Sequence, residues 1–173
     1  MSAEREEGTG RPAGPLAAFV ERVTIALAVA GGAILIAFSV LVTVSVVRRW
    51  LTSQGIPGDF ELVQLSLAIA VFAFLPLGQL RNSNIFVDTF TARAPRWVRT
   101  GLDLLWAFAY FLIAALITWR MTIGAFETIR SGTTTMVLGV PTGWAMLVSA
   151  LLAAWLVIVT LLTVIRFARS LSR

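Results

Sequence analysis

The stretch that decides the fold is VTIALAVAGGAILIAFSVLVTVSVV, residues 23–47, which contains 25 residues and no charge. At about 1.5 Å per residue, a helix of this length reaches about 37 Å, so it can cross a hydrocarbon core of roughly 30 Å with some tilt. The apolar core of a signal peptide is typically about 7–15 residues, and no A-x-A cleavage pattern follows this stretch. We therefore expect a retained transmembrane helix.

Three further apolar runs follow, at residues 60–80, 100–119 and 141–165. Pro141 suits the first turn of the last helix, where its missing N–H costs nothing. Backbone N–H and C=O groups cannot stay unpaired in lipid, so runs of this length should be helices. The alternating pattern of a membrane β-barrel is absent from the sequence. The sequence predicts an all-α membrane protein with four transmembrane helices. They form a single domain over residues 16–169, preceded by a disordered cytoplasmic tail over residues 1–15.

The composition limits the possible functions. Hydrophobic residues make up 58% of the 173 residues and charged residues 13%, whereas a soluble domain is about half apolar and a quarter charged. The sequence contains no cysteine and no histidine, which excludes disulfides, thiol nucleophiles, histidine general bases, and thiolate or imidazole metal ligands. We therefore expect no enzyme activity, no cofactor and no metal site.

The distribution of the arginines predicts the orientation in the membrane. All 14 basic residues are arginines near the ends of apolar runs, an arrangement typical of membrane-flanking charges rather than of a nucleic-acid surface. Ten fall on the side of the chain ends and of the link between runs two and three: Arg5, Arg11, Arg22, Arg81, Arg93, Arg96, Arg99, Arg166, Arg169 and Arg173. Four fall on the other side: Arg48, Arg49, Arg120 and Arg130. The positive-inside rule predicts a multi-pass membrane protein with both termini, and the link between runs two and three, in the cytoplasm.

Polar residues in and near the apolar runs are the candidates for function. Glu61 and Gln64 stand at the start of the second run. Glu61 can make a polar contact to another helix or to a partner subunit, or it can be an acid favoured by the dipole at a helix N-terminus. No run has a carboxylate at its midpoint, so we expect no self-contained ion or substrate pathway.

Two features predict how the helices pack. Small residues recur along the first run at Ala26, Ala30, Ala33 and Ala37, a pattern that either lets another helix approach closely or reflects an alanine-rich span. Two tryptophans, Trp106 and Trp155, lie deep in the third and fourth runs, and we expect both to pack between helices.

The segment PLGQLRNSNIFVDTF, residues 76–90, ends the second run. Pro76 lacks a backbone donor and can kink or end a helix, and Gly78 permits close approach of another helix. Ser83 or Asn84 could cap a short helix that lies along the cytoplasmic interface, with Asp88 in its first turn. The alternative is an interfacial turn without a helix.

The order of these motifs resembles the DctQ-like small membrane subunit of tripartite ATP-independent periplasmic (TRAP) transporters. The matching elements are Glu61, Leu77-Gly78, Arg81, Val87-Asp88, Ala94-Pro95, Arg96, Arg99, and the stretch TTTMVLGVPTGW at residues 133–144. The sequence departs from the family pattern at Asn84, where a histidine is usual, and at Ala94, where a leucine is usual. Asparagine can supply hydrogen bonds but does not titrate.

The resemblance implies a scaffold subunit of the bacterial inner membrane that binds a large permease subunit and, transiently, a periplasmic substrate-binding protein. Such systems import organic acids, commonly carboxylates, with a sodium gradient. The candidate subunit-interface or structural positions are Glu61, Gln64, Gly78, Arg81, Val87, Asp88 and Pro141. Two alternatives stay open from the residues: a membrane-anchor subunit of a respiratory enzyme and a small homodimeric exporter.

Overall fold

The computed structural model describes residues 15–81 and 96–171. The described part of the chain forms the helices α1 (Pro15–Thr52), α2 (Asp59–Leu80), α4 (Arg96–Ser131) and α5 (Gly143–Leu171). Each of these helices contains a segment that is long and apolar enough to cross a membrane. The predicted all-α membrane class is therefore confirmed. The expected interfacial helix after residue 81, with Val87 and Asp88, lies outside the described residues.

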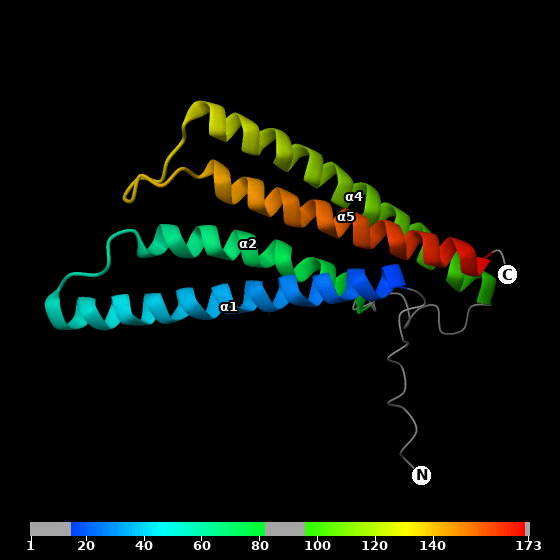
Figure 1. Ribbon diagram of the computed structural model, residues 1–173, viewed down its shortest axis with the longest axis horizontal. Coiled ribbons are helices and arrows are strands. Elements are labelled where there is room, and N and C mark those ends of the chain that lie inside the picture. Colours follow the sequence, from blue (N-terminus) through cyan, green and yellow to red (C-terminus); the bar gives the residue numbers. More distant parts are fainter. Residues whose placement is uncertain (1–14, 82–95, 172–173) are drawn as a thin grey trace, which may run out of the picture.

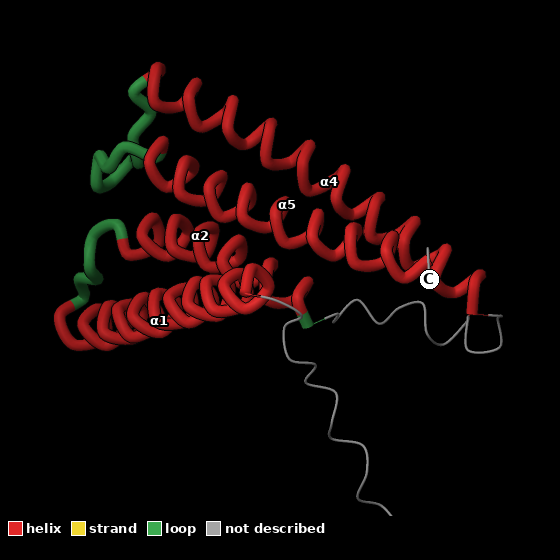
Figure 2. Tube along the Cα trace, turned by 45° about the vertical axis from the view of Figure 1, so that its right-hand side comes forward, coloured by secondary structure: helices red, strands yellow, loops and turns green. Residues whose placement is uncertain are grey.

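The described helices pack in the order α1, α2, α5, α4, with α1 and α4 at the two edges (Figures 1 and 2). This arrangement is an open layer rather than a closed bundle, because the described edge helices α1 and α4 do not pack against each other to any extent. The first residues of α1 and the last residues of α5 lie at one end of the molecule (Figure 1). The α1–α2 loop, residues 53–58, and the α4–α5 loop, residues 132–142, lie at the opposite end, which we call the loop end.

The layer is held by small side chains. At the contact between α1 and α2, Gly31 is buried, and an added Cβ would lie 2.9 Å from the Cβ of Ala73 and 3.6 Å from the backbone of Ala70. Ala28, Ala70 and Ala73 are also buried. In lipid, helices associate through close packing rather than through burial from water, and small residues allow their backbones to approach.

The predicted packing stripe on α1 is not used within this chain. Ala26, Ala30, Ala33 and Ala37 are exposed, whereas α1 meets its neighbours through Thr24, Ala28 and Gly31. The reason is rotational position: the buried set lies on another face of the same helix. The alanine stripe is thus an outer surface of the described layer.

The two deep tryptophans behave differently. Trp155 on α5 donates a hydrogen bond from Nε1 to Oγ1 of the fully buried Thr24 on α1, at 3.0 Å, so its predicted position between helices is confirmed. The prediction for Trp106 is wrong within this chain, because its side chain is 57% exposed on the edge helix α4. A helix at an edge of the layer has no second neighbour to cover that face.

The adjacent glycines Gly31 and Gly32 provide a matched test of the α1–α2 contact. The change Gly31→Ala forces the two backbones apart, and overpacking of this kind typically costs about 1–3 kcal/mol. In Gly32→Ala, the new Cβ meets only the Phe74 ring at 3.9 Å, so the better helix propensity of alanine should stabilise the fold by roughly 0.5–1 kcal/mol. When thermal unfolding is measured in detergent, only Gly31→Ala should have a lower midpoint than the wild-type chain. Equal midpoints would contradict the close contact.

Candidate interaction site at the loop end

Ser45 organises the connection between α1 and α2. Its side chain is fully buried, although it stands in the long apolar run of α1. The Ser45 hydroxyl donates to Oδ2 of Asp59, the first residue of α2, and accepts the backbone N–H of Ile56 at 3.0 Å. One side chain therefore fixes both the loop and the start of the next helix.

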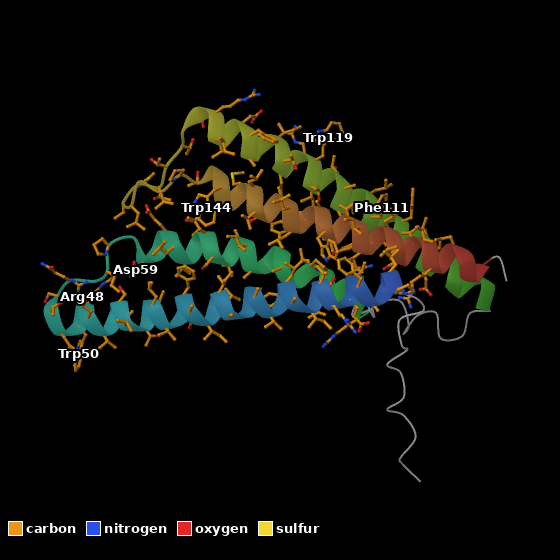
Figure 3. All side chains as sticks on the ribbon, viewed as in Figure 1. Arg48, Trp50, Asp59, Phe111, Trp119 and Trp144 are labelled. Carbon is orange, nitrogen blue, oxygen red and sulfur yellow. The ribbon has the colours of Figure 1, made fainter. Side chains whose placement is uncertain are left out.

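Asp59 completes this connection at the N-terminus of α2. Its Oδ1 accepts the backbone N–H of Phe60 at 2.7 Å, and Nη2 of Arg49 lies 3.8 Å from its Oδ2. A carboxylate is favoured here by the positive end of the helix dipole. Figure 3 shows Asp59 between the end of α1 and the start of α2. The charge of Asp59 is thus compensated by a helix terminus, a hydroxyl and an arginine.

The α4–α5 loop is a hydrogen-bonded hairpin rather than an irregular link. The N–H of Thr135 donates to the carbonyl of Val140 at 2.9 Å, and the N–H of Thr142 donates to that of Thr133 at 3.1 Å. Gly139 adopts a φ of 65° at the turn, a conformation that glycine tolerates. The hairpin presents Met136, which is 101% exposed, and Val137 at its tip.

Glu61 joins this hairpin to α2. Its Oε1 accepts the backbone N–H of Val137 at 2.8 Å, and its Oε2 accepts that of Leu138 at 3.0 Å. Hydrogen bonds to an ionised carboxylate are shorter and stronger than neutral ones, and using both oxygens also fixes the direction of approach. Glu61 lies in the first turn of α2, as the interpretation based on the helix dipole expects. It also makes a polar contact, but to the α4–α5 loop of the same chain rather than to another helix or a partner subunit.

Gly58 lets the two loops pack. It precedes α2 with a φ of 74°, and an added Cβ would overlap the side chain of Leu138. The helix pair α1–α2 and the helix pair α4–α5 are therefore joined at the loop end by the hydrogen bonds of Glu61 and by the contact of Gly58 with Leu138. We call this set of interactions the loop-end clasp.

The other predicted positions lie elsewhere on the described chain. Gln64 is exposed on α2, and Arg81 is exposed at its C-terminus, where its N–H donates to the carbonyl of Leu77 at 3.1 Å. Gly78 lies near that same end, and α2 continues through Pro76 to Leu80. Pro141 was expected in the first turn of the last helix, but α5 begins at Gly143, and Pro141 pairs with Thr134 in the hairpin. The structure thus brings Glu61 and Pro141 to the loop end, and places Gly78 and Arg81 at the other.

Sequence reasoning missed Ser45, Gly58 and Asp59. Two signals were available: Gly58-Asp59 is a turn residue followed by an acid at a helix start, and Ser45 interrupts an apolar run one turn before the paired arginines Arg48 and Arg49. Neither signal identifies the partners of Ser45, because they depend on the conformation of the loop between α1 and α2.

Two exposed tryptophans lie near the loop end. Trp50, which is 85% exposed, lies near the end of α1, and Trp144 lies near the start of α5 (Figure 3). Trp119 lies further from the loop end, because α4 continues beyond it to Ser131. Tryptophan side chains favour the membrane–water interface. The hairpin and the last turns of α4 therefore extend to or beyond that interface.

The acidic side chains at the loop end are engaged in contacts within the chain. Among residues 15–81 and 96–171, no three acidic side chains gather into a group that could hold a metal ion. The carboxylates of Asp59 and Glu61 are occupied by backbone amides, Ser45 and Arg49. What the clasp presents is a fixed surface with an apolar tip.

A scan against family models matches residues 38–170 to the DctQ component of the tripartite ATP-independent periplasmic transporters. The chain belongs to the DctQ family. The match begins within α1 and runs through the hairpin into the last turn of α5, so it includes the whole clasp. Searches of curated proteins and of solved structures found no match. The DctQ assignment confirms the resemblance seen in the motifs and makes the chain a small membrane subunit of a TRAP transporter.

The Glu61 contact can be tested by hydrogen exchange. In Glu61→Gln, one carboxylate oxygen is replaced by an amide NH₂ that cannot accept, so one of the two hairpin N–H groups loses its partner. We expect exchange at Val137 or Leu138 to accelerate by about ten-fold. The control is Glu127→Gln, since Glu127 is an exposed acid on α4 with no hydrogen bond to a described residue. Unchanged exchange in the Glu61 variant would disprove the contact.

The packing of the two loops has its own test. Both Gly58→Ala and Gly139→Ala place a side chain at positive φ, a strain of about 1–2 kcal/mol, but only the first also collides with Leu138. We expect Gly58→Ala to lower the unfolding midpoint more than Gly139→Ala. Adding Leu138→Ala should recover part of the difference, since it removes the colliding atoms. If the two single variants lose equal stability, the loops are not in contact.

Proposed function

We propose that this DctQ chain is a fixed scaffold subunit for a large permease subunit of a TRAP transporter. In this proposal, the permease subunit carries the substrate and sodium sites. The transporter imports organic acids, most commonly carboxylates, and uses a sodium gradient. A periplasmic binding protein delivers the substrate and binds the assembly transiently.

The family match over residues 38–170 is the observation that carries this proposal. The construction of the molecule supports it. The described helices form an open layer with broad apolar surfaces, and the acidic residues Asp59 and Glu61 hold the loop end together rather than line a pathway. A DctQ subunit is a component of a transporter, and the match gives no support to a respiratory anchor or a homodimeric exporter.

The orientation is part of the proposal. With both termini in the cytoplasm of a bacterial cell, the loop end faces the periplasm, where a soluble binding protein would meet it. The apolar hairpin tip and the exposed Arg48 then belong to the surface available to that protein. At the cytoplasmic end, we propose that Arg81, together with Val87 and Asp88, contributes to assembly with the permease subunit.

The proposal is tested by co-purification and reconstitution. The tagged chain, expressed with the large membrane component of its transporter and extracted in mild detergent, should retain that component. Liposomes containing both, with binding protein added, should take up an organic acid only with an inward sodium gradient, while the chain alone should transport nothing. Recovery of only a monomer or homodimer, or uptake by the chain alone, would contradict a scaffold function.

A further inference from the structure

One face of α2 remains uncovered by the rest of the described chain. The buried side of this helix carries Ser66, Ala70, Ala73 and Pro76, which pack within the layer. The opposite side forms a surface that runs from one end of α2 to the other, which we call the α2 seam. It consists of the exposed residues Phe60, Gln64, Leu67, Val71 and Phe74 and the partly buried Gly78, and the ring of Phe74 also lies beside Gly32 of α1. The spacing of three, four and seven residues places these positions on one helix face.

Gln64 gives the α2 seam a polar group that lipid cannot satisfy. Its side chain is exposed and has no hydrogen bond to any described residue. α2 has 22 residues and is about 33 Å long, only slightly more than the roughly 30 Å hydrocarbon core. Gln64 lies five residues after Asp59, about 7 Å along the axis, and therefore below the interface. A primary amide with two donors and an acceptor needs a partner at that depth.

The hydroxyl groups of the edge helices do not have this need. Thr43 on α1 donates to the carbonyl of Ser39 at 2.9 Å, and Thr118 and Thr122 on α4 each donate to a carbonyl four residues earlier at 2.8 Å. Their own helix satisfies them, so lipid can cover those faces. The contrast favours another protein at the α2 seam, rather than lipid.

Gly78 lies on the same face and leaves room for a close neighbour. A glycine has no side chain, so a packed helix can approach its backbone closely, as α2 approaches α1 at Gly31, where an added Cβ meets Ala73. At Gly78 an added Cβ would meet no described atom within 4 Å. Among the described residues, therefore, none fills the space above Gly78, and a helix from outside the chain can fit there.

We propose that the α2 seam receives one transmembrane helix of the large permease subunit, with a hydrogen-bonding side chain opposite Gln64 and its backbone close to Gly78. This inference rests on the proposed function. Positions 64, 71 and 78 are seven residues apart, and the outer two are separated by about 21 Å along the axis. A seven-residue repeat over this length fits a partner helix that runs alongside α2 at a shallow angle, not one that crosses it at a single point.

Site-specific photo-crosslinking tests the location of this interface. A photoreactive side chain is introduced at Leu67 or Val71 in the α2 seam, and as controls at Val29 on α1 and Leu112 on α4, which are similarly exposed. In the co-expressed complex, the seam positions should yield an adduct with the large subunit, and the controls should yield much less. Adducts from the controls alone, or an adduct with a second copy of this chain, would overturn the inference.

A pair of glycine substitutions tests the close approach. Gly78→Leu should reduce the amount of co-purifying large subunit at least about ten-fold, because the new side chain fills the space that the partner needs. Gly101→Leu is the matched control, since an added Cβ at Gly101 on α4 also meets no described atom within 4 Å. Equal unfolding midpoints for the two variants in detergent would show that the loss is one of assembly. Retention of the large subunit by Gly78→Leu would overturn the inference.

The substitution Gln64→Leu tests the polar contact separately from the close packing at Gly78. Gln64→Leu should weaken co-purification by several-fold in the same assay, whereas the isolated chain should keep its unfolding midpoint because no described residue loses a partner. If the wild-type chain retains the large subunit and both Gln64→Leu and Gly78→Leu behave like it, the seam is not the interface although the scaffold function stands. If the wild-type chain retains nothing, the proposed function fails first.

Discussion

At the loop end, the position of one helix pair against the other depends on the contact between Glu61 and the backbone of the α4–α5 hairpin. Along the helices, the packing of α2 on α5 and the hydrogen bond from Trp155 to Thr24 also join the pairs. Each pair of consecutive helices could form its own hairpin, but only contacts between the pairs fix one pair against the other. A carboxylate that accepts two adjacent N–H groups, at 2.8 and 3.0 Å, specifies both distance and direction. The Ser45–Asp59 connection places the start of α2 so that Glu61 can reach the hairpin.

The open shape of the layer follows from the chemistry of its contacts. Lipid tails are as apolar as leucine, so an apolar helix face gains little by turning from lipid to protein. The described core consists mostly of alanine and small hydroxyl residues, and large side chains such as Ile36, Leu112 and Trp106 remain on the outside. A chain built in this way does not close on itself, and its outer faces stay available to lipid or to another subunit.

The sequence was sufficient for the membrane class, the positions of the helices and the family, because each depends on local length, apolarity and motif order. Long-range pairing was not readable. Glu61 is separated by 76 and 77 positions from its partners Val137 and Leu138, and no local pattern in either segment predicts that they meet. The sequence also left open whether the alanine stripe of α1 is a packing face, because the stripe and the buried face of that helix both carry small residues. The position of Trp106 deep in its apolar run suggested packing between helices, but the sequence did not show that α4 lies at an edge of the layer.

The long separation between Glu61 and the hairpin has a consequence for biogenesis. During synthesis, α1 and α2 are complete long before residues 137 and 138 have been added to the chain. Until then, the carboxylate of Glu61 lacks the two N–H donors that it binds in the folded protein. The clasp can close only after α4 and the hairpin have been synthesised and inserted. A surface that exists only in the fully inserted subunit distinguishes finished molecules from truncated or half-inserted ones, so any partner that binds the loop end selects complete subunits for assembly.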